Sequence, residues 1–140
     1  MPREIKFRAW YKLLAQMVES DKLESINFDT KTLGVYMAHE GRGFHKLRMS
    51  DFVLMQFTGL KDRNGKEIYE GDILSGYNGG YLFVIQYFQP DCRYIAVNAE
   101  DYATGKWDDA DEAIGLVWVA CEVIGNVWEH PHILEGGTTA

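Results

Sequence analysis

The sequence is poor in the residues that mark metal sites, redox sites and membrane spans. Only two of its 140 residues are cysteines, Cys92 and Cys121, which are too few and too far apart for a thiolate metal site or a CxxC redox pair. Because the interior of a cell is reducing, we expect two buried thiols and no disulfide. No apolar run approaches the ~18 residues that a membrane span needs, and charges interrupt the first eight residues, where a signal peptide has its apolar core. We therefore expect a soluble, cytoplasmic protein without a membrane partner.

Basic residues are scarce as well. Fourteen Lys and Arg stand against 21 Asp and Glu, so the net charge is −7 at pH 7 and the pI is near 5.0. A field of this sign repels polyanions, and no stretch gathers enough Lys or Arg to form a basic face. Duplex nucleic acid is therefore disfavoured as a partner. The acidic run from Asp108 to Glu112 is typical of a solvated loop, and it could also mimic nucleic acid toward a basic protein.

What the sequence does contain is typical of a globular domain rich in β-strands. Hydrophobic residues make up 46% of the chain and aromatic residues 14%, enough for one core in one domain of this length. Apolar residues alternate with polar ones in several short stretches, a period of two that predicts strands. Residues 45–52 show no clear period, so we expect a turn of helix or irregular chain there. The predicted strands cover residues 5–10, 17–19, 23–28, 33–38, 53–57, 81–88, 92–98 and 116–128.

Short strands joined by Gly and Asn turns predict the fold class. We expect a mainly β protein in which antiparallel strands form a small, partly open barrel, SH3-like in its second half, with an N-terminal hairpin and little helix. A short helix is expected within residues 99–113, and one helical turn after Pro131. A single domain should cover residues 1–135, with the hairpin and first strands in 1–55, the barrel-like part in 56–135, and a frayed tail in 136–140.

The densest turn chemistry lies between Gln56 and Leu74, where the chain reads QFTGLKDRNGKEIYEGDIL. Asn64-Gly65 suits the two positive φ angles of a type I′ hairpin turn. Gly59 and Gly71 stand where a bulge or a sharp corner needs a residue without a Cβ. Asp72 can accept hydrogen bonds from the backbone amides of its own turn. All these interpretations are structural.

The same stretch fails the templates for a bound ion or phosphate. The calcium loop needs Gly at its sixth position and Glu at its twelfth, and counting from Asp62 the chain has Glu67 and Ile73 there. The phosphate-binding P-loop is excluded too, because Gly59 to Lys66 does not match its glycine pattern and no helix signature accompanies it. We therefore expect no calcium site and no nucleotide site in this motif.

Three blocks of the chain resemble the YopX family of phage and prophage proteins. The block from Gln56 to Leu74 matches the family signature Q-Y/F-T-G-L-K-D-x-N-G-K-E-I-Y-E-G-D-I/V. The two further blocks are REIKFRAW, from Arg3 to Trp10, and CEVIGNVWEHP, from Cys121 to Pro131. The chain departs from the family pattern at Tyr11 to Gln16, which affects the first turn. The resemblance implies a compact, mostly β protein encoded in phage or prophage genomes, with no established enzymatic activity and no catalytic residues to carry over.

Other candidate sites rest on single clusters. Glu129, His130 and His132 lie close together in the sequence and are weak candidates for a zinc or manganese site; the alternative is that the histidines face water. Neither cysteine lies in a nucleophile motif, and no catalytic residue and no cofactor is expected.

The predicted binding surface combines hairpin residues with strand aromatics. On a small barrel, exposed aromatic rings can stack single-stranded bases, and basic residues at a hairpin tip can contact phosphates; an interface with another protein would use the same residue types. The predicted surface comprises Lys61, Arg63, Asn64, Lys66, Tyr77, Tyr81 and Tyr87.

Three functions follow from these patterns. The first is a non-enzymatic accessory protein of a phage or prophage, acting in the bacterial host cytoplasm through contacts with a host or phage protein and through self-association as a homo-oligomer. The second is a module for single-stranded nucleic acid. The third is a metal-dependent hydrolase that uses His130 and His132.

Overall fold

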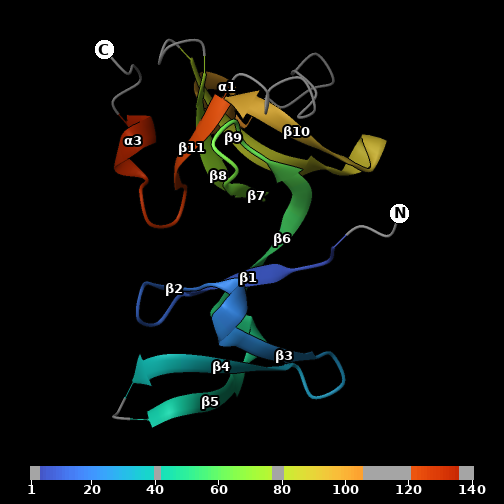
Figure 1. Ribbon diagram of the computed structural model, residues 1–140, viewed down its shortest axis with the longest axis vertical. Helices are drawn as coiled ribbons and strands as arrows, with labels where there is room; N and C mark the ends of the chain where they lie inside the picture. The colour runs from blue at the N-terminus through green and yellow to red at the C-terminus, as the bar shows by residue number, and fades with distance from the viewer. Residues whose placement is uncertain (1–3, 40–41, 77–80, 106–120, 136–140) are drawn as a thin grey trace. The chain divides into compact units, whose positions relative to one another are not determined.

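The chain forms two compact units, one from Met1 to Gln56 and the other from Phe57 to Ala140. The computed structural model describes residues 4–39, 42–76, 81–105 and 121–135, which are coloured in Figure 1. Within these ranges no helix is long and apolar enough to cross a membrane. The predicted acidic loop from Asp108 to Glu112 and the predicted tail lie outside the described residues.

The first unit is built from short antiparallel strands. Five strands and the first half of a sixth, β6 (Phe52–Lys61), are joined by tight turns and by the 3-10 turns η1 (Ser20–Lys22) and η2 (Met49–Asp51). Three of the strands form a separate sheet in the order β3-β4-β5. The strands before β6 are β1 (Phe7–Tyr11), β2 (Gln16–Val18), β3 (Leu23–Asn27), β4 (Thr32–His39) and β5 (Arg42–Arg48).

The predicted N-terminal hairpin is confirmed. Strand β1 pairs antiparallel with β2, with Ala9 opposite Val18, and its other edge pairs with β6, with Ala9 opposite Leu54. Alternation along β1 places Ala9 and Tyr11 in the core, where the ring of Tyr11 stacks on Phe52 with centroids 4.7 Å apart. The other buried members of this core are Val18, Leu33, Val35 and Met37.

The expectation of a turn of helix or irregular chain over residues 45–52 is met only in part, because Met49–Asp51 form the 3-10 turn η2 whereas residues 45–48 belong to strand β5 and Phe52 begins β6. The side chains of His45 and Leu47 point inward, where they stand opposite the buried Val35 and Leu33. The side chain of Phe44 points outward. A polar residue thus stands on the inner face and an apolar one on the outer face. This exchange hides the period of two from any reading of hydropathy.

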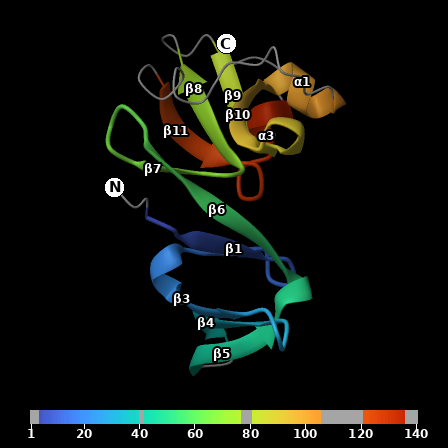
Figure 2. The ribbon, with the colours of Figure 1, turned by 90° about the vertical axis from the view of Figure 1, so that its right-hand side faces the viewer.

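The second unit contains a curled four-stranded antiparallel sheet in the order β10-β9-β8-β11 (Figure 2). The second half of β6 enters this unit and pairs with β7, with Phe57 opposite Tyr69. The mainly β, antiparallel class with a partly open barrel in the second half is confirmed. The elements after β6 are β7 (Glu67–Tyr69), β8 (Asp72–Gly76), β9 (Tyr81–Phe88), the 3-10 turn η3 (Gln89–Asp91), β10 (Arg93–Asn98), α1 (Ala99–Thr104), β11 (Cys121–Asn126) and α3 (His132–Glu135).

Strand β9 is buried on both faces. One face packs Phe83 and Ile85 into a cluster with Ile68, Leu74, Ala96 and Cys121. The other face packs Leu82 and Val84 against the two short helices, through Tyr102 of α1 and Leu134 of α3. This explains why residues 81–88 read as a continuous apolar run rather than an alternation. The predicted helices within 99–113 and after Pro131 correspond to α1 and α3.

The two cysteines differ from expectation in one respect. Neither is in a disulfide, and Cys121 is buried, but Cys92 is exposed. The predicted strand over residues 92–98 begins only at Arg93, because Cys92 has a left-handed φ of 53° at the end of η3. A position in this turn, rather than in the sheet, leaves its thiol at the surface.

Candidate functional site

The turn at Asn64-Gly65 joins β6 and β7, but it is not the predicted type I′ turn. Of the described residues in the loop, only Gly65 has a positive φ, of 85°. The amide of Gly65 donates to the carbonyl of Asp62 at 3.0 Å, and the amide of Asp62 donates to the carbonyl of Lys66 at 2.8 Å. This is a three-residue loop closed by a glycine bulge, which needs one left-handed residue instead of two.

Asp62 ties this loop to strand β11. Its side chain is buried, and its carboxylate accepts hydrogen bonds from the amides of Asn64 (2.8 Å), Lys66 (2.9 Å) and Val123 (2.8 Å). Burial raises the pKa of Asp62, but the three amide donors and the charge of Lys66 together outweigh it and hold the pKa below its ordinary value. The carboxylate therefore stays charged and acts as a structural tie.

Two of the predicted surface residues are also held by β11. The side-chain amide of Asn64 donates to Glu122 Oε2 at 2.8 Å, and the guanidinium of Arg63 lies 3.6 Å from the same oxygen. The side chains of Lys61 and Lys66 are exposed at the loop. Only part of the predicted basic tip is thus available to a ligand.

The remaining turn residues of the motif have structural roles. Gly59 has a φ of 91° and lies where the pairing of β6 with β7 shifts register, which confirms the predicted bulge. Gly71 has a φ of 88°. The buried Asp72 accepts the amide of Tyr69 at 2.7 Å, so the expected bond within its own turn is present. Thr58 donates to the carbonyl of Ile68 at 2.7 Å.

The predicted aromatic surface does not come together on one patch. Tyr81 and Tyr87 face the same side of β9 at its two ends, so about 20 Å of strand separates them. Tyr81 lies at the end of the sheet that is near the β6–β7 loop. It pairs with Gly76, Gly76 pairs with Cys121, and the carbonyl of Cys121 accepts the amide of Arg63 at 3.2 Å. Tyr87 packs edge-on against Tyr94, with centroids 5.3 Å apart. Tyr77 lies outside the described residues.

The histidines near the C-terminus stack edge-on, with ring centroids 6.0 Å apart. Nδ1 of His130 accepts the amide of Asn126 at 3.1 Å, and the carboxylate of Glu129 accepts the side-chain amide of Asn126 at 2.9 Å. Two of the weak metal candidates therefore serve to close this turn. Among the described residues no group of three or more His, Cys, Asp or Glu side chains is placed to hold a metal ion.

The sequence interpretation missed an aromatic pair on the outer face of the sheet β3-β4-β5. Tyr36 and Phe44 stand opposite each other on β4 and β5, 48% and 43% exposed, with ring centroids 5.2 Å apart. The next outward rows contain Gly34 with Lys46 and Thr32 with Arg48. We call Tyr36, Phe44, Lys46 and Arg48 the outer sheet face. In the sequence only the position of Tyr36 within the predicted strand 33–38 pointed to this face, because β5 was not predicted as a strand.

The charges of this outer face are mixed. Arg48 forms an ion pair with Asp51 at 3.4 Å and keeps 77% of its side chain exposed. Lys46 makes no ion pair or hydrogen bond within the described part of the chain. The carboxylate of Glu24 lies over Gly34, beside the ring of Phe44. The face thus combines aromatic contact area with charges of both signs.

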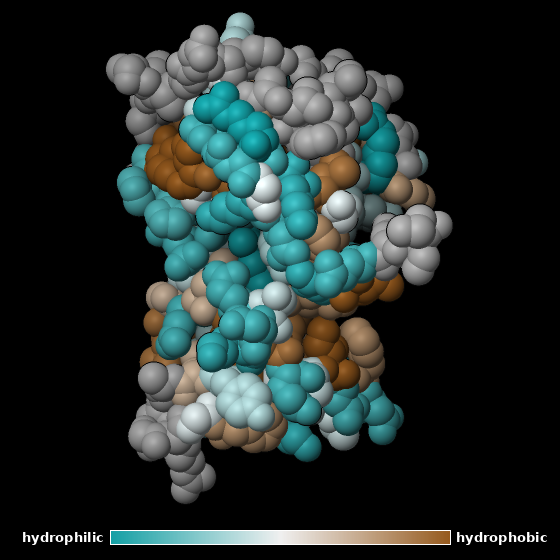
Figure 3. Space-filling model, in the orientation of Figure 1, coloured by the Kyte–Doolittle hydropathy of each residue, from teal (hydrophilic) through white to brown (hydrophobic). Residues whose placement is uncertain are grey.

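The two units also differ in net charge. Residues 1–56 contain nine Lys and Arg against seven Asp and Glu, a net charge of +2. Residues 57–140 contain five against fourteen, a net charge of −9. The overall value of −7 therefore hides a slightly basic unit and a strongly acidic one. On the side of the molecule drawn in Figure 3, hydrophobic residues appear as separate patches among hydrophilic ones.

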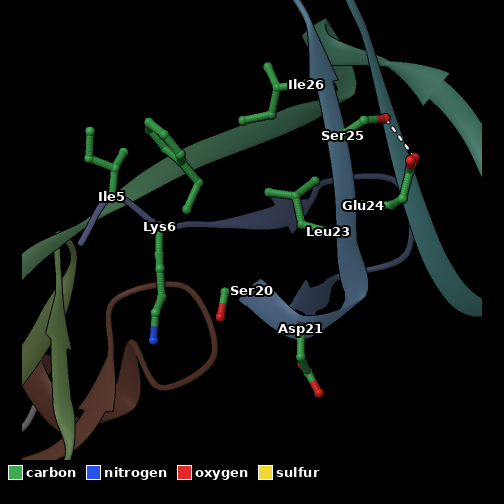
Figure 4. A pocket seen from close by; sticks show the side chains of 9 residues that line it. Ile5, Lys6, Ser20, Asp21, Leu23, Glu24, Ser25 and Ile26 are labelled. Carbon is green, nitrogen blue, oxygen red and sulfur yellow. Dashed lines mark hydrogen bonds between the residues drawn. The ribbon is translucent and has the colours of Figure 1, made fainter.

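The first unit also has an open cleft of about 460 Å³ between the start of β1 and the segment η1-β3. Figure 4 shows Leu23 and Ile26 directed from β3 toward the side of Ile5, while Ser25 and Glu24 point the other way and are bonded to each other at 2.8 Å. The residues that line the cleft include one basic side chain, Lys6, and two acidic ones, Asp21 and Glu24.

Comparisons with known proteins agree with this geometry. Comparison with curated proteins finds no match. Among solved structures, the crystal structure of protein EF1440 from Enterococcus faecalis is similar, with a TM-score of 0.59 and 25% sequence identity over 95% of this chain and 99% of that chain. A family model described as YopX protein matches residues 6–135. Because this match covers nearly the whole chain, including the hairpin that Asp62 ties to β11, the protein belongs to the YopX family.

Proposed function

We propose that this YopX protein is a non-enzymatic accessory protein of a phage or prophage, which acts in the bacterial cytoplasm through protein contacts and associates with itself. The observation that carries the proposal is the exposed pair Tyr36 and Phe44 on a sheet face that no described element covers. Aromatic residues and Arg are enriched in protein interfaces. A nearly half-exposed aromatic pair beside Arg48 has this composition.

The charge pattern supports a protein rather than a nucleic acid on this face. Glu24 and Asp51 accompany Lys46 and Arg48, so the face has little net charge. Affinity for nucleic acid comes largely from cations that neutralise phosphates, and two acidic groups oppose it. Mixed charges around an aromatic centre instead suit the polar rim of a protein interface.

Self-association is supported by the opposite charges of the two units. The first unit has a net charge of +2 and the second a net charge of −9. The first unit of one copy should therefore attract the second unit of another copy. Contacts between unlike surfaces are heterologous and build rings or filaments. This attraction should weaken as salt is added.

Sedimentation velocity over a range of protein concentrations tests the proposal. We expect the wild type to sediment as a species larger than the monomer, with less association at high salt and in the double variant Tyr36→Ala, Phe44→Ala. Phe28→Ala is the matched control, because Phe28 is 65% exposed in the same unit but lies in the turn after β3. A monomer at every concentration and at low salt would reject self-association.

The second candidate function is the binding of single-stranded nucleic acid. It is supported by the exposed Lys61 and Lys66, which lie near the same end of the sheet as Tyr81. Filter binding at low salt decides this case. Retention of a single-stranded oligonucleotide by the wild type, and its loss in the double variant Lys61→Glu, Lys66→Glu, would favour the second candidate. No retention by the wild type would remove it.

A further inference from the structure

Strand β5 is the outer strand of its sheet. In the order β3-β4-β5 it has β4 as its one strand neighbour among the described residues, and Figures 1 and 2 both show it at the sheet's margin. A strand at an edge presents backbone N–H and C=O groups that can pair with another chain. With seven residues, β5 is long enough for an added strand to form several such bonds.

The described side chains of β5 select the charge of such a strand. The titratable ones are His45, Lys46 and Arg48, and none is acidic. The acidic groups near them are Asp51, which pairs with Arg48, and Glu24, which lies over Gly34 opposite Lys46. A second copy of β5 would place like charges opposite each other, which destabilises a strand pair. An incoming strand that carries carboxylates would instead pair with Lys46, whose ammonium group has no ion-pair partner in the described chain.

The aromatic pair selects one further side chain. Phe44, Lys46 and Arg48 point to the same face at intervals of two residues. In an antiparallel added strand the residues opposite them run in the reverse order, so the matching pattern is acidic, any, acidic, any, aromatic. The last side chain of this pattern lies against Phe44, within reach of Tyr36.

We propose that the edge of β5 binds an extended acidic segment of a partner protein as an additional strand. Backbone hydrogen bonds supply affinity and the alternate side chains supply selectivity, as in other cases of strand addition. The carboxylates lie against Lys46 and Arg48, and the aromatic residue packs on Phe44. This inference rests on the proposed function, for which it names a class of partner and the site.

Fluorescence anisotropy with labelled synthetic peptides tests the inference on the full chain. The probe is TETETFT, and TKTKTFT has the charges reversed. We expect the wild type to bind only the acidic peptide, and Lys46→Glu to weaken binding about tenfold, because an attraction becomes a repulsion. Lys12→Glu is the matched control, since Lys12 is exposed in the same unit but lies in the β1–β2 turn. Circular dichroism checks that each variant is folded.

A second probe separates strand addition from simple charge attraction. The peptide TETETFT with N-methyl groups on the alternate amides that face β5 keeps its charges but cannot complete a β-ladder, so we expect its binding to be lost. Equal binding of the methylated peptide, equal affinity of the Lys46→Glu and Lys12→Glu variants, or no binding by the wild type would each overturn the inference. So would binding of a single-stranded oligonucleotide that displaces the peptide.

The result of this experiment is distinguishable from that of the proposed function. If the wild type self-associates in the ultracentrifuge but does not bind TETETFT, the proposed function stands and the β5 site is rejected. If the peptide binds and the protein stays monomeric, the β5 site stands and self-association is rejected. Absence of both results would reject the two proposals together.

Discussion

Asp62 shows how a single residue in the family signature can be structural and still charged. Its side chain is 4% exposed, and both carboxylate oxygens are occupied by backbone amides of its own loop and of β11. A carboxylate that accepts several amide hydrogen bonds keeps its charge at low cost. The Asp of this motif therefore connects two segments 61 residues apart in the chain.

Replacing this side chain should destabilise the second unit. We expect Asp62→Ala to lower the free energy of unfolding by about 3 kcal/mol. Three backbone amides lose a charged acceptor, and one of them, the amide of Val123, belongs to strand β11. Urea denaturation measures the change. Asp29→Ala serves as the control, since Asp29 is exposed in a turn, and it should change stability by less than about 0.5 kcal/mol. Equal effects of the two substitutions would contradict the role of Asp62.

The lowered pKa of Asp62 makes this contribution depend on pH. A carboxyl group whose pKa is lower in the folded state stabilises the fold fully above its unfolded pKa, about 3.9, and loses this contribution as pH falls through the folded pKa. The difference in unfolding free energy between the wild type and Asp62→Asn should thus be constant above pH ~5 and shrink in stronger acid. Urea titrations at several pH values measure it, and a difference that grows in acid would refute the assignment.

At the scale of elements, the end of β11 is shaped by close approach of a side chain to a glycine. The pairing of β11 with β8 shifts register between Val123 and Gly125, and a Cβ on Gly125 would lie 2.7 Å from Nδ1 of His130. The same imidazole accepts the amide of Asn126. The glycine and the histidine of the C-terminal block are therefore one local packing unit.

This contact can be measured with a double-mutant cycle. We expect Gly125→Ala to destabilise the protein by about 1–3 kcal/mol through overpacking, and His130→Ala to destabilise it through the lost hydrogen bond. The double variant should be destabilised by less than the sum of the two single changes, because removing the imidazole makes room for the methyl group. Gly43→Ala, where nothing lies near the added Cβ, is the control. Strictly additive effects would contradict a direct contact between the added methyl group and the imidazole.

At the scale of the whole molecule, stability should be unevenly distributed among the strands. Strand β9 is covered on both faces and paired at both edges, whereas β5 is paired at one edge and open on its outer face. Amides exchange through openings whose free energy rises with local burial.

Hydrogen exchange followed by NMR should resolve this difference. We expect the amides of Val84 and Ile85 to exchange among the slowest in the protein, and those of β5 that point away from β4 to exchange rapidly. Addition of the acidic peptide should slow exchange in β5 and leave β9 unchanged. Uniform protection of both strands would contradict an open edge at β5.

Much of this architecture was predictable because the signals are local. The hairpin of β1 and β2, the strands β9 and β10 and the bulge at Gly59 follow from strand propensity and from turn residues that have few alternative conformations. The prediction of two positive φ angles at Asn64-Gly65 was wrong, because Asp62 bonds to the loop amides and stabilises a longer loop. In β5, His45 faces inward and Phe44 outward, so hydropathy alone concealed the strand.

The candidate site was much less predictable. The sequence placed Tyr81 and Tyr87 in one strand but did not show that residues 82–85 between them are buried, so that the two rings do not share one exposed surface. It also could not show that Glu122 holds both Arg63 and Asn64, because that contact joins segments far apart in the chain.

By itself the sequence determined the family, the β class and the positions of most turns, because these depend on side-chain chemistry and on residues close together in the chain. The tertiary structure alone decided which groups meet. It placed Tyr36 beside Phe44, left β5 at an edge, and joined Asp62 to Val123. The physical reason is that strand pairing and burial are set by contacts between distant segments, and a local pattern contains no information on which strand becomes an edge.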